Sequence, residues 1–316
     1  MKHLVLVDGH HLMYRAFYAI PSTLKTSKGE QTNAVYGVAS MLISLLKAEE
    51  PDALVFCFDA GEETFRHKEH AEYKEGRAET PDEFYVQIPR ILELLDSFPI
   101  QHCSDPRYEA DDLLCVYAKE GEKHGMRVTI VTGDRDAFQL ATDKVRIAIP
   151  HKGYQAPEYL DPAAILAKYG VRPDQVPSYK GISGDSSDNL PGVKGIGPKG
   201  ASSLLQQYGT LQGVYEHLAE IKPTLRQKLE RDREQAFFCE RMATLVCDFP
   251  APIPIENLAL TAIPTSRAVT FLRELEFTSL IKRLESLCTS PYARGKFLWE
   301  GSAAPVKNEK SQMALF

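Results

Sequence analysis

The stretch His3-Leu4-Val5-Leu6-Val7-Asp8 lies close to the start of the chain and indicates the fold that we expect. A short apolar run that stops at a charged residue is typical of a strand buried on both faces of a parallel sheet. Similar runs recur at residues 53–58, 100–103, 128–132 and 145–149. Because helical patterns separate these runs, we predict an α/β fold with a mostly parallel sheet and helices on both faces.

The intervening helices are marked by apolar residues at helical spacing. Residues 33–49 and 110–123 show this spacing without interruption. Residues 84–98 also read as a helix, with a disturbance at Pro89 and with Thr80 as a candidate N-cap.

A change of pattern divides the chain. The strand pattern stops near Asp161, and helices broken by Gly and Pro then continue to about Cys288. The remaining residues show no sustained period. We therefore predict an α/β domain over residues 1–175, a helical domain over residues 176–290 and a flexible tail over residues 291–316.

Composition narrows the class of protein. The 316 residues are 43% hydrophobic and 25% charged, as in soluble globular proteins, with no run long enough to cross a membrane and no signal peptide. Six cysteines without a CxxC pair favour reduced thiols in a cytoplasmic protein. A net charge of −6 argues against nucleic acid, unless the acids are gathered to bind cations.

Acidic residues close three of the predicted strands. Asp8, Asp59 and Asp134 each follow an apolar run, and Asp136 comes two residues later. Ligands of parallel sheets lie at the carboxyl ends of the strands, so these side chains are expected at one edge. Carboxylates brought together in this way need cations to remain ionised.

Two further acidic groups join this set. Glu109, Asp111 and Asp112 open the helix of residues 110–123, where all three converge only if the helix start is frayed. Asp185 and Asp188 lie in a polar, Gly-rich loop. Each group alone could be a helix cap, a dipole contact or a turn. The joint pattern instead indicates a site for hard cations.

These acids occur in five separate motifs, Val7-Asp-Gly, Phe58-Asp-Ala, Glu109-Ala-Asp-Asp, Thr132-Gly-Asp-Arg-Asp and Gly184-Asp-Ser-Ser-Asp-Asn-Leu-Pro-Gly. The set resembles the 5′-nuclease family, which includes the 5′–3′ exonuclease domain of bacterial DNA polymerase I and the flap endonucleases. The resemblance covers roughly residues 1–288 and implies a PIN-like α/β domain. It also implies two or more Mg²⁺ or Mn²⁺ ions, whose +4 would offset much of the acidic charge.

Ligand roles follow from the same resemblance. It implies a first ion held through Asp59, Glu109, Asp111, Asp112 and Asp134, and a second held through Asp136, Asp185 and Asp188. Asp8 would order bound water. The implied reaction is hydrolysis of a DNA phosphodiester that leaves a 5′-phosphate.

A basic segment at residues 61–80 matches the family's helical arch, under which the 5′ strand passes. The match implies that Arg66, Lys74 and Arg77 contact phosphates, the last two at the reacting phosphate, and that Tyr73 stacks on a base. Arg15 matches a further phosphate contact. Several glutamates nearly balance this charge, so a plain solvated loop is the alternative.

Residues 190–200 resemble a helix–hairpin–helix motif. Gly192, Gly195 and Gly197 would let the backbone approach phosphates, and Lys194 and Lys199 would add charge. In the family this motif grips the duplex and often holds K⁺. A purely structural turn is the alternative.

The last residues suggest a partner. Gln312-Met-Ala-Leu315-Phe316 resembles the peptide by which bacterial repair proteins dock on the sliding clamp, unless it is an incidental frayed end. We expect a monomer that acts on branched, nicked or flapped DNA, or on an RNA primer–DNA hybrid, without membrane contact. The alternatives are a PIN-type RNA nuclease, which normally lacks the 190–200 segment, and a non-catalytic DNA-binding module.

Overall fold

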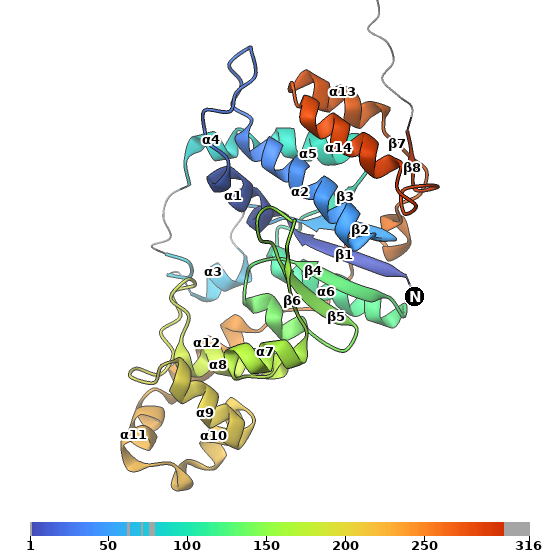
Figure 1. Ribbon diagram of the computed structural model, residues 1–316. Helices are drawn as coiled ribbons and strands as arrows, with labels where there is room; N and C mark the ends of the chain where they lie inside the picture. Colours follow the sequence, from blue (N-terminus) through green and yellow to red (C-terminus); the bar gives the residue numbers. More distant parts are fainter. Residues whose placement is uncertain (1, 62–63, 71, 76–79, 300–316) are drawn as a thin grey trace, which may run out of the picture.

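A six-stranded sheet with the order β3-β2-β1-β4-β5-β6 forms the centre of the molecule (Figure 1). The structure is a computed structural model that describes residues 2–61, 64–70, 72–75 and 80–299. The first five strands run parallel and β6 is antiparallel to β5. The strands are β1 (His3–Asp8), β2 (Ala53–Cys57), β3 (Gln101–Cys103), β4 (Arg127–Val131), β5 (Val145–Ile149) and β6 (Glu158–Leu160).

Helices cover both faces of the sheet, as predicted. Along β1, Val5 and Val7 pack on one face and Leu4 and Leu6 on the other, and all four are fully buried. The first face is covered by α1 (Gly9–Ala19), α2 (Asn33–Glu49), α5 (Ile88–Ser97), α13 (Ser266–Glu274) and α14 (Thr278–Cys288). On the second face lie α6 (Ala110–Lys123) and the 3₁₀ helix η1 (Asp136–Leu140).

A helical lobe extends from the second face (Figure 1). Its helices are α7 (Pro162–Tyr169), η2 (Pro173–Gln175), α8 (Val176–Ser183), α9 (Pro198–Tyr208), α10 (Leu211–Glu216), η3 (Leu218–Glu220), α11 (Pro223–Arg231) and α12 (Arg233–Ala243). Within the lobe α8 packs tightly on α12, because a Cβ on Gly181 would lie 2.8 Å from the Ala236 carbonyl oxygen. The next segment returns to the sheet through η4 (Ile255–Leu258).

The helix expected at residues 84–98 is divided in two. It consists of α4 (Asp82–Tyr85) and α5, and Pro89 lies in the first turn of α5, where a missing N–H costs nothing. Thr80 does not cap α4. Its hydroxyl forms a hydrogen bond of 2.8 Å with the Tyr14 hydroxyl.

Part of the predicted tail is folded. β8 (Phe297–Leu298) pairs in parallel with β7 (Ile263–Pro264), and Phe297 is buried beside α13 and α14. Lys296 also donates to Asp52 at 2.6 Å. The expectation of a flexible tail from residue 291 is therefore wrong for residues 291–299, which have no periodicity because they form turns and a two-residue strand.

One cysteine pair also departs from the expectation of reduced thiols. Cys115 of α6 and Cys247, which follows α12, form a disulfide with 5.4 Å between their Cα atoms. The two residues are 132 positions apart, so spacing in the sequence does not indicate the pair. No helix in the described part of the chain is both long and apolar enough to cross a membrane.

Candidate active site

Three acids lie at the carboxyl ends of neighbouring strands. Asp8 ends β1, Asp59 follows β2 and Asp134 follows β4. Because β1 lies between β2 and β4, the three side chains reach one edge of the sheet, as the strand pattern predicts.

Asp8 is buried and held at both carboxylate oxygens. Oδ1 accepts the backbone N–H of His11 at 2.9 Å and so caps α1, while Oδ2 accepts the Thr132 hydroxyl at 2.8 Å. Burial, together with the charges of Asp59 and Asp134, raises the pKa of Asp8 to about 7 against the effect of these hydrogen bonds. Asp8 therefore benefits from a nearby cation at neutral pH.

Without divalent cations, the free energy of unfolding should fall as the pH rises from about 4 to about 7. The pKa of Asp8 rises from 3.8 to about 7 on folding, so in this window the folded chain holds a proton that the unfolded chain has lost. The stabilisation is complete below about pH 4 and is lost above about pH 7. Urea titrations across this window should show a shallower pH slope in Asp8→Asn; the same slope in both proteins would contradict the assignment.

The three acids at the start of α6 do not point to one place. Asp111 faces the strand ends: burial, followed by the charges of Asp134 and Asp8, raises its pKa. Its buried Oδ1 has no hydrogen-bond partner among the described residues. Asp112 is fully buried and turned away, because Glu109 and Asp112 form a capping box on an intact helix start. Asp112 is therefore not placed to bind the first ion directly, in contrast to the predicted ligand role.

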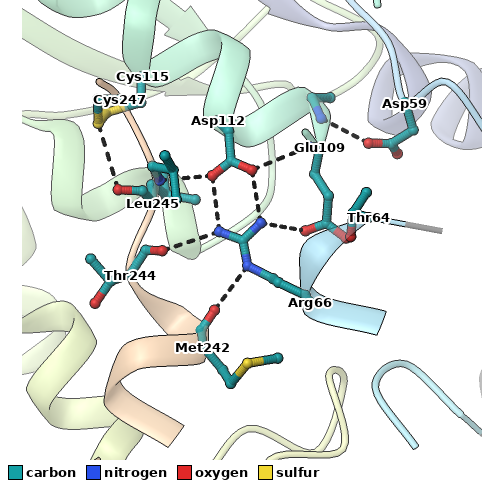
Figure 2. A network of polar contacts seen from close by, with 12 residues as sticks. Asp59, Thr64, Arg66, Glu109, Asp112, Cys115, Met242, Thr244, Leu245 and Cys247 are labelled. Atoms are coloured by element: carbon teal, nitrogen blue, oxygen red, sulfur yellow. Dashed lines mark hydrogen bonds and ion pairs between the residues drawn. A yellow bond between two sulfur atoms is a disulfide. The ribbon is translucent and has the colours of Figure 1, made fainter. Parts of the chain in front are cut away.

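Asp112 is instead bound by Arg66, which lies in α3 (Phe65–Glu69) (Figure 2). The guanidinium donates to both Asp112 oxygens at 2.8 and 2.9 Å, and to Glu109 at 3.1 Å. It also donates to the carbonyls of Met242 at 2.9 Å and Thr244 at 3.1 Å. Arg66 is only 1% exposed, so it joins α3, α6 and the end of α12 inside the protein. Because Arg66 is buried and paired in this way, it is not placed to contact DNA, and that prediction is wrong for this structure.

Two residues that follow α3 also contact Glu109. The Tyr73 hydroxyl donates to Glu109 at 3.2 Å, and the ammonium of Lys74 does so at 2.7 Å. Tyr73 is 5% exposed, so in this arrangement its ring is not free to stack on a base. Lys74 remains partly exposed beside the acids. The predicted phosphate contact Arg77 lies outside the described residues.

The acids Asp8, Asp59, Glu109, Asp111 and Asp134 form a first cluster, and a second acidic cluster lies beside it. Asp136, Asp185 and Asp188 each present an oxygen, and these oxygens lie within 4.8 Å of one another. The ammonium of Lys180, on α8, forms ion pairs with Asp136 and, at 2.5 Å, with Asp185. Burial alone would raise the pKa of Asp185, but the charge of Lys180 and the hydrogen bonds from Lys180 and Ser187 together outweigh burial and lower that pKa. Sequence reasoning missed Lys180, because no motif marks it.

The two clusters face a common small cavity. Its lining includes Glu109, Asp111, Asp134, Asp136 and Asp188. The atoms that these acids offer to a metal ion are all carboxylate oxygens, which are the ligands that Mg²⁺ and Mn²⁺ prefer. The orphaned oxygen of Asp111 is the kind of buried group that a cation would satisfy. The residues present therefore fit divalent cations.

Comparison with known proteins agrees with this geometry. Residues 3–170 match the model of the N-terminal resolvase-like domain of 5′–3′ exonucleases, and residues 171–266 match that of their C-terminal SAM fold. The chain belongs to the 5′–3′ exonuclease family. DNA polymerase I of Bacillus subtilis is 42% identical over 284 residues, which cover 90% of this chain and 32% of that protein. The chain spans about a third of the length of the curated relatives it matches.

Solved structures share the fold. The flap endonuclease of bacteriophage T5, in a pseudo-enzyme-product complex with DNA and metal ions, matches with a TM-score of 0.65 and 20% identity over 93% of this chain and all of that one. Flap endonuclease-1 of Methanococcus jannaschii matches with a TM-score of 0.57 and 20% identity over 90% and 91% of the two chains.

The segment between α8 and α9 in this exonuclease-family chain has a tight backbone. Gly192 has φ +60°, and a Cβ there would lie 2.2 Å from the Gly184 nitrogen, so only glycine fits. Gly195 has φ +85° at the exposed end of the loop. Lys194 and Lys199 are exposed. Gly197 immediately precedes α9 as its N-cap.

A larger cavity of about 890 Å³ adjoins the second acidic cluster. It lies between the sheet edge and the helical lobe, and its lining includes His11, Asp134, Arg135, Tyr169, Tyr179 and Lys180. Arg15, one turn further along α1, lines a neighbouring cavity that shares His11. Acidic, basic and aromatic side chains thus follow one another along this side of the protein.

Proposed function

We propose that this chain is a divalent-metal-dependent 5′ nuclease that hydrolyses phosphodiesters in branched, nicked or flapped DNA during replication and repair. The observation that carries the proposal is the convergence of Glu109, Asp111, Asp134, Asp136 and Asp188 around one small cavity. Asp8 and Asp59 lie at the neighbouring strand ends, and their charges act on Asp111. Family membership supports the same reaction. The DNA and metal ions named for the T5 structure belong to that protein and support the substrate class here.

Mg²⁺ or Mn²⁺ would be held by the residues of the two clusters. The first position would use Asp59, Glu109, Asp111 and Asp134 as ligands, with Asp8 ordering water beside them. The second would use Asp136, Asp185 and Asp188. Bound cations supply a more acidic water and stabilise charge on the leaving oxygen. Asp112 and Arg66 would position Glu109 without binding the cation, because they are paired with each other in the interior.

The larger cavity is the proposed path of DNA to the acids. Arg135 offers positive charge there, and Tyr169 and Tyr179 offer rings for contact with sugar or base. Lys194 and Lys199 would hold the duplex through its phosphates, and Arg15 would contact a further phosphate from the neighbouring cavity.

We also propose that backbone carbonyls of the hairpin bind K⁺. Lys228 donates to the Gly195 carbonyl at 2.9 Å, and Arg231 donates to the Lys194 carbonyl at 3.1 Å. These two side chains already place positive charge at carbonyls of the turn. K⁺ would have to displace them or use other carbonyls.

Lys74→Ala should slow the chemical step by about tenfold or more and weaken DNA binding only slightly. The ammonium lies beside the acids, 2.7 Å from Glu109, where it can act on charge that develops at the reacting phosphate. Single-turnover rates at saturating enzyme measure the step. Lys68→Ala, an exposed lysine of α3, is the matched control and should keep the rate. An unchanged rate with a weaker Kd in Lys74→Ala would assign Lys74 to steering alone.

Lys194→Ala and Lys199→Ala should instead weaken duplex binding and flatten its salt dependence. Each lysine that neutralises a phosphate contributes about one unit to the slope of log affinity against log salt. Fluorescence anisotropy from about 50 to about 200 mM salt gives the slope. Wild-type slopes in both variants would show that the hairpin does not contact phosphates.

The substrate class is tested by cleavage in Mg²⁺ of a 5′-flapped duplex, a nicked duplex, single-stranded DNA and an RNA primer annealed to DNA. Cutting of the flapped or nicked duplex in preference to single strands is expected. Preferred cutting of RNA single strands would favour a PIN-type RNA nuclease. Tight binding to the flapped duplex without cleavage would favour a non-catalytic DNA-binding module.

Three further proposals concern the partner, the oligomeric state and the location of the protein. Gln312, Leu315 and Phe316, proposed to dock on a sliding clamp, lie outside the described residues. Calorimetry of the full chain, and of a chain ending at Ser311, against the clamp tests them; equal binding by both would remove the clamp as a partner. We also propose that the protein acts as a monomer in the cytoplasm.

A further inference from the structure

Lys180 occupies an unusual place for a lysine. It is 7% exposed, and its ammonium lies among the acids of the second cluster, in ion pairs with Asp136 and Asp185. A divalent cation bound by Asp136, Asp185 and Asp188 would have to lie among the same oxygens. The ammonium and the cation therefore compete for one position.

The helix that carries Lys180 is fixed, whereas its side chain has room to move. α8 is packed on α12 through Gly181, and Ser178 in α8 forms a hydrogen bond with Glu240 in α12. Lys180 is also one of the residues that line the cavity of about 890 Å³ beside the cluster. The four-carbon stem can therefore turn the ammonium out of the cluster and into this cavity while the helix stays in place.

We infer that Lys180 is a built-in counter-ion of the second cation position, which it fills in the absence of DNA and leaves when a divalent cation binds. One positive charge compensates the clustered carboxylates in part, and so keeps them together without metal. A divalent cation provides more charge and repels the ammonium. The inference rests on the proposed function, because it assumes that the second cluster binds a cation.

This exchange would couple the second cation to the substrate. An ammonium displaced into the cavity would meet a DNA phosphate on the proposed path, and pairing there would stabilise the displaced position. DNA would then raise the affinity of the second position for the cation, and the cation would raise the affinity for DNA by the same factor. The lysine would thereby disfavour loading of the second cation until substrate is present.

The test is a titration of the full chain with Mn²⁺ alone, by calorimetry or by electron paramagnetic resonance of free Mn²⁺. Lys180→Met keeps the aliphatic stem and removes the charge, so it should bind Mn²⁺ at least about tenfold more tightly than wild type at one site. Adding Asp185→Asn to Lys180→Met should abolish this gain. Lys168→Met is the matched control. Lys168 lies on α7 and pairs with Glu158 of β6 at 2.6 Å, and its loss changes the net charge equally.

The outcomes separate this inference from the proposed function. Wild-type protein that binds Mn²⁺ and cleaves flapped DNA, with no tighter site in Lys180→Met, would overturn the role of Lys180 alone. The same gain in Lys168→Met would assign the effect to net charge and would also overturn it. If Lys180→Met unfolds without metal, Mn²⁺ should restore its fold, and failure to do so would contradict the inference. Wild-type protein that neither binds Mn²⁺ nor cleaves would overturn both.

Discussion

Asp134→Asn should lower the rate of DNA cleavage by at least about a hundredfold. Asp134 follows the central strand β4 and lines both the small cavity between the acidic clusters and the larger cavity beside the helical lobe. It also raises the pKa values of both Asp8 and Asp111, so it lies close to each of them. Asparagine keeps the size of the side chain but removes the charge that a cation needs. Single-turnover cleavage of a flapped duplex in Mg²⁺ measures the loss.

A matched control separates this effect from general damage. Asp143→Asn changes an exposed aspartate in the turn before β5 and should leave the rate unchanged. Binding of flapped DNA by Asp134→Asn, measured in Ca²⁺, should stay within a few-fold of wild type, since Asp134 is proposed to hold metal rather than DNA. A variant that keeps more than about a tenth of the wild-type rate would contradict its role as a ligand.

Arg66→Met should lower the free energy of unfolding by about 3–5 kcal/mol. Arg66 and Asp112 are both buried, and the substitution leaves Asp112 as an uncompensated charge. The backbone carbonyls of Met242 and Thr244 also lose their hydrogen-bond donor. Urea denaturation of the metal-free protein measures the change. The loss should be concentrated where α3, α6 and the end of α12 meet, because Arg66 joins all three (Figure 2).

Two controls test the reason for this loss. Arg66→Met combined with Asp112→Leu should recover a large part of the stability, since no buried charge is then left without a partner. Arg107→Met breaks an exposed pair with Asp105, 2.8 Å apart, and should change stability little. Equal losses in Arg66→Met and Arg107→Met would contradict the view that burial makes the Arg66 contacts important.

The sheet and its acidic edge could be predicted because their pattern is local. β1 is six consecutive buried residues that end in Asp8, and the sequence shows each of these features directly. Parallel strands have their carboxyl ends at one edge, so the acids after β1, β2 and β4 are expected there, although the order of the strands is not predicted. Short elements such as β6 and β8 give no comparable pattern, because two or three residues cannot show a period.

The pairing of charges could not be predicted, because it depends on contacts between distant residues. Arg66 lies in a basic segment that resembles a DNA-binding loop, yet its partner Asp112 is 46 positions away and removes it from the surface. Lys180 and Asp136 are brought together only when the helical lobe folds against the sheet edge. A motif identifies which acids occur, whereas the fold decides which of them are already paired with a cationic side chain.

The central claim is that divalent cations held by these acids carry out the cleavage. The most direct test removes metal from the wild-type chain with a chelator and then titrates Mg²⁺ back while cleavage of a 5′-flapped duplex is followed. Cleavage should be absent in the chelator, return with Mg²⁺ or Mn²⁺, and remain absent with Ca²⁺ although DNA is still bound. Cleavage that persists in the chelator, or no cleavage at any Mg²⁺ or Mn²⁺ concentration while the protein is folded and bound to DNA, would contradict the claim.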